Sequence, residues 1–401
     1  MAGAVLYLCG RRDQTAQCLA ESAGRAGVEF SAVEMGWSAC DALPRLDEIR
    51  AHARDRVPTG AIAGLLAGDR VSAICAAYIA EQQGLAFHSV EAMETCAQRL
   101  LARECLKAAG IQVAEAFLVP STAGFEDAIH RTSFPCVLKP VRFTGGQGVI
   151  RADGPDEFRE VFNTLKEIAG EGAHEYFLVE EYVGGEEFVF HGFAVAGRLH
   201  SLALFDKPSG KTGPTFQDTI LTTPSRHPRN VTAELMHVAG LAVSSMRLDN
   251  GPVSVEMKWD GRRAVVLEVN PFLPPLPVCW ALSPKGRNAV GEAILLACAG
   301  LEPPLLSFHH AAGVGYLPLP RPGIFEGLDG VEEATGPDGA DEVRACLDAG
   351  QMGYPPPKGD QRAAFLTARG DTAEEVEKRL RRALSVLSVR ISPALTAGVA
   401  G

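Results

Sequence analysis

The chain has 401 residues, of which 46% are hydrophobic and 22% charged, and its formal charge at pH 7 is −11. These values are typical of a globular protein with about two to four domains, and they exclude a fibrous or largely disordered chain. The acidic excess argues against nucleic acid or an anionic membrane as partner, because both require clustered Lys and Arg.

The apolar runs of the chain are short, and the N-terminal one precedes Arg11 and Arg12, which is the reverse of the order in a secretory signal peptide. The ten cysteines are scattered without a CxxC pair. We therefore expect a cytoplasmic protein with reduced, packed cysteines, while one catalytic thiol stays open as an alternative.

The first ninety residues alternate short apolar runs with an amphipathic stretch. We expect strands at Val5–Cys9 and Phe30–Glu34, a helix at Thr15–Ala26, and further buried runs at Ala73–Ala77 and Leu85–Phe87. This alternation predicts a small, Rossmann-like parallel sheet covered by helices. The first strand is not followed by a GxGxxG loop, so the pattern gives little support to dinucleotide binding.

A helical pattern over Met93–Gly110 is followed by the first chemically informative segment. Lys139 ends a short apolar strand, and a glycine-rich turn with Gly145, Gly146 and Gly148 follows. An ammonium group and glycine N–H groups could together cradle phosphate oxygens. A surface hairpin would show the same local pattern.

A second segment carries carboxylates on both sides of a glycine pair. The expected strand Tyr176–Val183 includes Glu180, Glu181, Tyr182 and Val183, and Glu187 begins the next strand. Backbone groups of this segment could read an adenine edge, and the Glu187 carboxylate could accept hydrogen bonds from ribose hydroxyls. A solvated acidic hairpin is the alternative.

A third segment is a hairpin with Glu256 on one strand and Glu268 and Asn270 on the other. The two-residue period of a strand puts Glu268 and Asn270 on one face, and Glu256 can join them across the hairpin. Carboxylate and carboxamide oxygens in an apolar strand, completed by triphosphate oxygens, are suited to Mg²⁺ or Mn²⁺.

The remaining pattern predicts an antiparallel sheet and a closing helix. The expected strands are Glu187–Val195, Leu199–Phe205, Val253–Trp259, Ala264–Val269, Gly313–Leu317 and Ala363–Ala368. A helix over Thr372–Leu387 should end the fold. Between Lys207 and Arg226, a Gly- and Pro-rich segment is expected to form a loop over the site.

The order and spacing of the three segments resemble the ATP-grasp superfamily, and within it the carboxylate–amine ligases that include the L-amino acid ligases. The resemblance covers about Met93 to Pro303. It implies that Arg103, seven residues before Gly110, and Lys139 contact phosphates. It also implies an adenine hinge at Glu180–Val183, a ribose carboxylate at Glu187, and metal ligands at Glu256, Glu268 and Asn270.

The fold implied by this resemblance is an α/β ATP-grasp fold. It consists of an N-terminal domain at 1–94, a core at 95–305 with a lid subdomain at about 120–182, and a C-terminal domain at 306–401.

The chain departs from the resemblance directly after Asn270. Many members carry an arginine there that steadies a substrate carboxylate or phosphate, whereas this chain has Pro271-Phe272-Leu273. We expect Lys258 or Arg287 to supply the catalytic positive charge, with Lys285 as a further candidate.

The resemblance implies an ATP- and Mg²⁺-dependent ligase that joins a small carboxylate, such as that of an amino acid, to an amine. The alternatives are a carboxylase or formyl-phosphate-forming enzyme with the same nucleotide apparatus, and a regulatory protein that binds ATP without turnover. A homodimer is suggested only by the general frequency of dimers.

Overall fold

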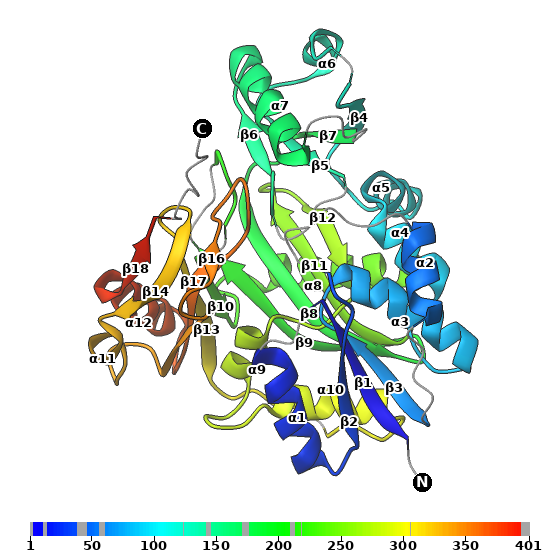
Figure 1. Ribbon diagram of the computed structural model, residues 1–401, viewed down its shortest axis with the longest axis vertical. Helices are drawn as coiled ribbons and strands as arrows, with labels where there is room; N and C mark the ends of the chain where they lie inside the picture. Colours follow the sequence, from blue (N-terminus) through cyan, green and yellow to red (C-terminus); the bar gives the residue numbers. More distant parts are fainter. Residues whose placement is uncertain are drawn as a thin grey trace, which may run out of the picture.

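The computed structural model describes residues 3–10, 14–37, 46–55, 61–122, 124–141, 146–170, 176–208, 213–217, 219–304 and 306–393. Three units surround one large sheet (Figure 1). The N-terminal unit lies on one side of this sheet, the C-terminal unit on the other, and a small lid subdomain rises above both. Gly145, one of the predicted phosphate contacts, lies outside the described residues.

The N-terminal unit is the predicted parallel sheet, with strand order β2-β1-β3. Its strands are β1 (Ala4–Cys9), β2 (Phe30–Glu34) and β3 (Ile62–Ala67), and its helices are α1 (Gln14–Ala26), α2 (Leu46–Asp55) and α3 (Arg70–Gln83). The buried run expected at Ala73–Ala77 is part of a helix and not of the sheet. This run lies within α3, where every residue from Arg70 to Ala80 is buried and amphipathic periodicity is therefore absent.

Two short helices lead from this unit to the lid. They are α4 (Val90–Ala97) and α5 (Arg99–Ala108), which divide the predicted Met93–Gly110 helix at Gln98. The lid is a four-stranded antiparallel sheet in the order β4-β7-β5-β6. Its elements are β4 (Ala116–Pro120), α6 (Glu126–Arg131), β5 (Cys136–Pro140), β6 (Ile150–Ala152), α7 (Pro155–Ala169) and β7 (Tyr176–Glu181). An aromatic core that includes Phe158, Phe162 and Phe177 holds α7 on this sheet.

The large sheet has eight strands in the order β12-β11-β8-β9-β10-β13-β17-β15. Its strands are β8 (Glu186–Val195), β9 (Arg198–Lys207), β10 (Ile220–Thr223), β11 (Gly251–Trp259), β12 (Ala264–Asn270), β13 (Ala311–Pro318), β15 (Glu342–Ala345) and β17 (Arg362–Gly370). Helix α8 (Arg229–Ser245) packs against β11 and β12, and α9 (Leu276–Leu282) and α10 (Ala289–Cys298) pack within the core that joins this sheet to the N-terminal unit. The sheet continues across residue 305, so the predicted C-terminal domain completes the core rather than standing apart from it.

The C-terminal unit adds α11 (Val331–Ala334) and α12 (Ala373–Val386), together with a small sheet in the order β16-β14-β18. The strands of the small sheet are β14 (Gly323–Asp329), β16 (Met352–Gly353) and β18 (Ser388–Ser392). The helix predicted at Thr372–Leu387 is confirmed, with Thr372 as its N-cap, but it does not end the fold because β18 follows and pairs with β14.

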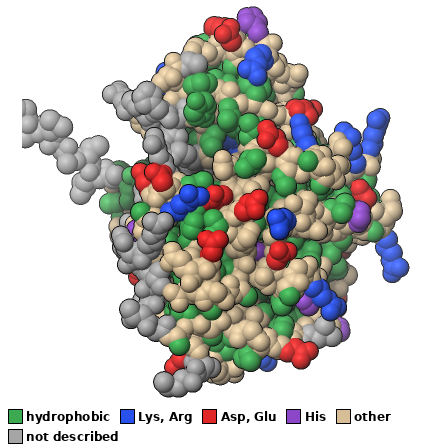
Figure 2. All heavy atoms as spheres, turned by 90° about the vertical axis from the view of Figure 1, so that its right-hand side faces the viewer, with side chains coloured by type: hydrophobic (Ala, Val, Ile, Leu, Met, Phe, Trp, Pro, Cys, Tyr) green, Lys and Arg blue, Asp and Glu red, His purple; other side chains and the backbone are tan. Residues whose placement is uncertain are grey.

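None of the helices in the described part of the chain has the length and apolarity that crossing a bilayer requires. On the face shown in Figure 2, acidic and basic side chains are interspersed rather than gathered into separate patches.

The glycine pair between the lid and the large sheet supplies a test of this geometry. Gly185 has φ +98°, and a Cβ there would lie 2.0 Å from the Trp259 carbonyl oxygen, whereas a Cβ on Gly184 would meet nothing within 4 Å. Gly185→Ala should therefore lower the free energy of unfolding by about 2–4 kcal/mol, and Gly184→Ala by less than about 0.5 kcal/mol. Urea unfolding of both variants measures this, and equal effects would contradict the geometry.

Candidate active site

Two carboxylates lie directly opposite each other at the centre of the site. The register of β11 with β12 pairs Glu256 with Glu268, and Asn270 pairs with Ser254 two positions along. The Glu256 and Glu268 side chains are 34% and 26% exposed. Like charges at directly opposite positions repel each other, so this pair requires cations nearby. The structure thus brings together the three residues predicted to bind metal.

Arginines from two helices neutralise Glu268. Arg70 at the start of α3 forms an ion pair with Glu268 and donates from Nη2 to Asn270 Oδ1 at 3.1 Å, and Arg99 Nη1 lies 3.2 Å from a Glu268 oxygen. Burial alone would raise the pKa of Glu268, but the charges of Arg99, Arg70 and Lys139 together hold this pKa well below its ordinary value. Glu268 is therefore ionised, as a metal ligand must be.

The fit of this group to a divalent cation follows from its donor chemistry. Within the described residues no three His, Cys, Asp or Glu side chains are arranged to hold a metal ion. Two carboxylates and one carboxamide are nevertheless a suitable partial set for Mg²⁺, which normally completes its coordination with substrate phosphates and water. The residues present therefore fit a magnesium ion held jointly with a nucleotide.

A second charge cluster joins the lid to α5. The Glu180 carboxylate on β7 forms ion pairs with both Arg103 on α5 and Lys139 on β5, and all three side chains are buried. Burial and the nearby Arg99 lower the pKa of Arg103 to about 10. Burial, Arg103 and Arg99 also lower the pKa of Lys139 well below its ordinary value. The positive charges of Arg99, Arg103 and Lys139 are thus concentrated in one buried region, which is suited to binding triphosphate oxygens.

The hinge after β7 is partly occupied by hydrogen bonds within the protein. The N–H groups of Glu181 and Tyr182 donate to the carbonyl oxygens of Glu115 and Pro135, at 2.9 and 3.2 Å. Lys258 Nζ donates to the Val183 carbonyl oxygen at 2.9 Å and lies 4.8 Å from the centre of the Tyr182 ring. Lys258 therefore supports the hinge, whereas we had expected it beside the reacting carboxylate.

One lysine connects the predicted ribose contact to the metal carboxylates. Lys207 Nζ lies 2.7 Å from Glu187 Oε1 and 3.1 Å from Glu256 Oε2. The strand register explains this position: Glu187 on β8 is opposite Lys207 on β9 and opposite Lys258 on β11, and Glu256 is two residues before Lys258. The Lys207 and Glu187 side chains are both at least nine-tenths buried. The sequence indicated Lys207 only as one edge of a loop.

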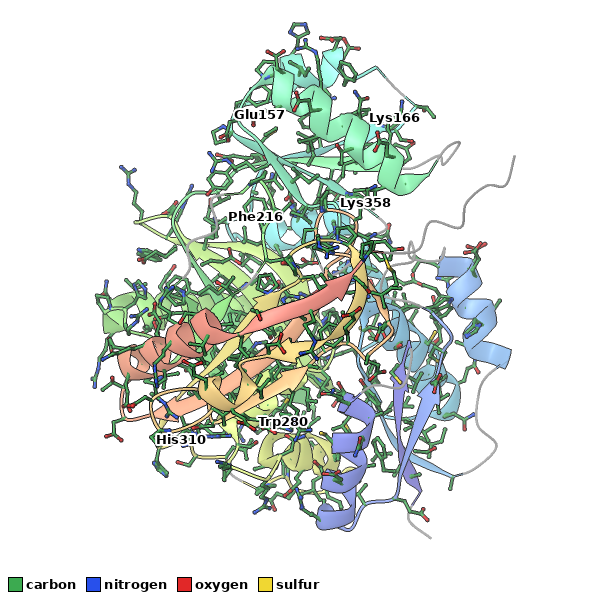
Figure 3. All side chains as sticks on the ribbon, turned by 60° about the vertical axis from the view of Figure 1, so that its left-hand side comes forward. Glu157, Lys166, Phe216, Trp280, His310 and Lys358 are labelled. Atoms are coloured by element: carbon green, nitrogen blue, oxygen red, sulfur yellow. The ribbon has the colours of Figure 1, made fainter. Side chains whose placement is uncertain are left out.

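The glycine-rich turn contacts the C-terminal unit. Gly146 and Gly148 have φ +87° and +67°, as expected for a tight turn. The Gly148 N–H, however, donates to the Pro357 carbonyl oxygen at 2.9 Å, and Gln147 Nε2 donates to the Lys358 carbonyl oxygen at 2.8 Å. Figure 3 shows Lys358 and Phe216 at the foot of the lid. The Gly148 N–H is thus engaged by the protein and does not point freely to a phosphate.

Arg287 lies in a different place from the other predicted residues. Its guanidinium donates to both carboxylate oxygens of Glu292 on α10, and it lines a cavity of about 290 Å³ with Lys285, Trp280 and Arg344. Figure 3 shows Trp280 well below the lid. The structure therefore does not bring Arg287 to the two carboxylates. Arg287 lies in the connection between α9 and α10 and pairs with a residue of α10.

The described cysteines give no support to a thiol nucleophile in this site. None of the described cysteines forms a disulfide, and burial raises the pKa of Cys96, Cys136, Cys279 and Cys298 to about 12. A thiol with so high a pKa carries almost no thiolate at neutral pH.

Comparisons with known proteins agree with this geometry. Residues 132–273 match the model of the ATP-grasp domain, and residues 315–392 match that of the L-amino acid ligase C-terminal domain 2. Residues 132–273 therefore belong to an ATP-grasp domain.

Among solved structures, this chain is similar to an L-amino acid ligase from Bacillus licheniformis, with 19% identity and a TM-score of 0.80 over 98% of this chain and 100% of that chain. It is also similar to a carboxyaminoimidazole ribonucleotide synthase from Aspergillus clavatus complexed with ATP, with 17% identity and a TM-score of 0.72 over 96% and 98% of the two chains. These matches show the fold. Among curated proteins, human carnosine synthase 1 is 28% identical over 48% of this chain, and the match spans only 24% of that protein.

Arg70 is the site residue that the sequence did not reveal. It lies 198 positions before its partner Glu268, and its only local signal is a basic residue at the first position of a buried helix. The sequence also did not reveal the contact of Lys207 with Glu187, because that contact depends on the register of β8 with β9.

Lys207 supplies a test of the charge arrangement. Lys207→Met should lower the free energy of unfolding by about 2–4 kcal/mol, because Glu187 and Glu256 lose the buried ammonium that neutralises them. Lys107→Met is the control, since its pair with Glu115 is largely exposed and should contribute less than about 1 kcal/mol. Thermal and urea unfolding measure both, and similar small losses would show that Lys207 carries no buried charge pair.

Proposed function

We propose that this protein is an ATP-dependent ligase that activates a carboxylate as an acyl phosphate and joins it to an amine. The observation that supports this most is the row of groups running from the hinge to the carboxylate pair. Lys207 links Glu187 to Glu256, Glu256 faces Glu268, and Arg103 and Lys139 stand on the lid side. This row is suited to adenosine at one end and triphosphate with a metal at the other.

The reaction needs no protein nucleophile. A carboxylate oxygen bonds to the γ-phosphorus while the bond to the β–γ bridging oxygen breaks, and its electron pair leaves with ADP. The amine nitrogen then bonds to the acyl carbon, the acyl–oxygen bond breaks with release of phosphate, and the nitrogen loses a proton. Most of the catalysis in such a transfer comes from positioning and charge stabilisation.

Each side chain has a separate role in this scheme. Glu187 would bind ribose hydroxyls, and the segment Glu180–Val183 would hold the adenine with its remaining backbone groups. Arg103 and Lys139 would bind triphosphate oxygens. Glu256, Glu268 and Asn270 would hold Mg²⁺, which neutralises phosphate charge when bound.

The names of the similar proteins support an amino acid as substrate, since one is an L-amino acid ligase and another a carnosine synthase. An amino acid would carry both the carboxylate and the amine of the proposed reaction.

The direct test supplies ATP, Mg²⁺ and single amino acids, with hydroxylamine as a small amine. An acyl phosphate is expected to be trapped as a hydroxamate, with one ADP and one phosphate released for each hydroxamate formed. A second series with pairs of amino acids and mass spectrometry then identifies the amine. AMP in place of ADP would contradict acyl-phosphate chemistry, dependence on bicarbonate or formate would favour the carboxylase alternative, and ATP binding without turnover would favour the regulatory one.

Lys139→Ala should lower ATP turnover by about 10²–10³-fold while the protein stays folded, since it removes a buried cation from the phosphate site. Lys166→Ala is the matched control because Lys166 is exposed on α7 of the same lid, away from its foot (Figure 3). Steady-state ADP release with circular dichroism measures both effects. Turnover by Lys139→Ala equal to that of the control would remove Lys139 from the phosphate site.

A further inference from the structure

Arg70 occupies a position that is unfavourable unless an anion faces it. It is the first residue of α3, its side chain is only 4% exposed, and the first turn of the helix contains no acidic residue. A cation at a helix N-terminus is destabilised by the helix dipole, and burial adds a desolvation cost. The Asp69 N-cap accepts from the Ser72 and Gly10 N–H groups and thereby fixes the start of the helix. Arg70 is therefore held in place at a cost.

Glu268 and Asn270 satisfy only one part of the Arg70 guanidinium. Both contacts use Nη2, while Nε and Nη1 are buried and have no hydrogen-bond partner in the described part of the chain. An arginine carries five N–H donors in a planar fork that matches the oxygens of a carboxylate or phosphate. These two nitrogens can therefore donate to a further anion beside Glu268.

The position of Arg70 distinguishes it from the phosphate cations. Arg103 and Lys139 contact Glu180 at the lid, and Arg99 lowers the pKa of both, which places its charge with theirs. Arg70 instead reaches Glu268 from α3 of the N-terminal unit, and Arg99 contacts the same Glu268 oxygen from α5.

The chain that follows Asn270 supplies no cation on that side. Phe272 packs against the apolar core of the N-terminal unit, and the Leu273 N–H donates to the Ala67 carbonyl oxygen. Ala67 is only three residues before Arg70, and Arg70 itself contacts Asn270. The apolar segment after Asn270 and the Arg70 side chain therefore both lie next to Asn270.

We propose that Arg70 binds the carboxylate substrate and keeps hold of it as it becomes the acyl phosphate. This inference rests on the proposed ligase function. The guanidinium holds the substrate oxygens beside Glu268 and Asn270, so that a free carboxylate oxygen points to the γ-phosphate. Arg70 thus provides, from another unit of the fold, the positive charge that the segment after Asn270 lacks.

The test compares Arg70→Met and Arg70→Lys with the wild type in the hydroxamate assay, using the amino acid that gives the most hydroxamate with the wild type. Arg70→Met should raise KM for that amino acid about 10- to 100-fold, the loss expected for a charged hydrogen bond. Arg70→Lys keeps the positive charge but lacks the planar guanidinium group, so its KM should lie between those of the wild type and Arg70→Met. A fluorescent ATP analogue tested without Mg²⁺ should bind both variants within about twofold of the wild type, since Arg103 and Lys139, the proposed triphosphate contacts, are unchanged.

Two further measurements separate binding from a structural role. The amino acid with ADP should raise the melting temperature of the wild type but not of Arg70→Met. Arg379→Met is the control, because Arg379 is also largely buried and paired with a carboxylate, Asp341, in the C-terminal unit. It should lose stability without a change in KM.

An unchanged KM in Arg70→Met, or a parallel loss of ATP affinity, would overturn the assignment while leaving the ligase function intact. If Arg70→Met does not fold, Arg70→Lys with wild-type KM would overturn it as well. If the wild type gives no hydroxamate with any amino acid, the proposed function itself fails and the inference falls with it.

Discussion

The pairing of β11 with β12 imposes the constraint on which the site depends. It places the carboxylates of Glu256 and Glu268 directly opposite each other. Like charges at directly opposite positions destabilise a sheet unless cations lie close to them. The cations come from different parts of the fold: Lys207 from β9 and Arg70 and Arg99 from helices α3 and α5. Correct assembly of the N-terminal unit against the large sheet is therefore a condition for a stable carboxylate pair.

The lid depends on the rest of the molecule in a similar way. Glu180 on the lid binds Arg103 from α5, so the lid is attached through a charge cluster as well as through Gly184 and Gly185. At its other edge, Gln147 and Gly148 donate to carbonyl oxygens of the C-terminal unit. Because these hydrogen bonds use few groups and no apolar core, the lid is joined more weakly at this edge than within its own aromatic core.

Sequence patterns predicted the local elements well, because alternation and helical periodicity depend on near neighbours. The strands β8, β11 and β12 and the helix α12 follow directly from such patterns. The Ala73–Ala77 run showed no helical periodicity, because a helix that is buried on all sides has no polar face. Lys258 was expected near the carboxylates from strand alternation, but its ammonium group donates to the Val183 carbonyl oxygen of the hinge. Arg287 was expected there because it follows the metal strand closely, but it pairs with Glu292 on α10. Arg70 could not be found in this way, since its partner lies 198 residues later.

The charges of the site also explain how a chain with a net charge of −11 can accept a polyanion. Each cation of the site is paired with a carboxylate: Arg103 and Lys139 with Glu180, Lys207 with Glu187 and Glu256, and Arg70 with Glu268. Under the proposed function, a triphosphate with its metal would enter by exchange of partners, because carboxylate oxygens would hold the metal while the released cations would turn to phosphate and substrate oxygens. Such an exchange avoids the cost of exposing an unpaired charge in a dry site at any stage. The acidic residues of this site therefore do not oppose anion binding but keep the required cations buried and ready for it.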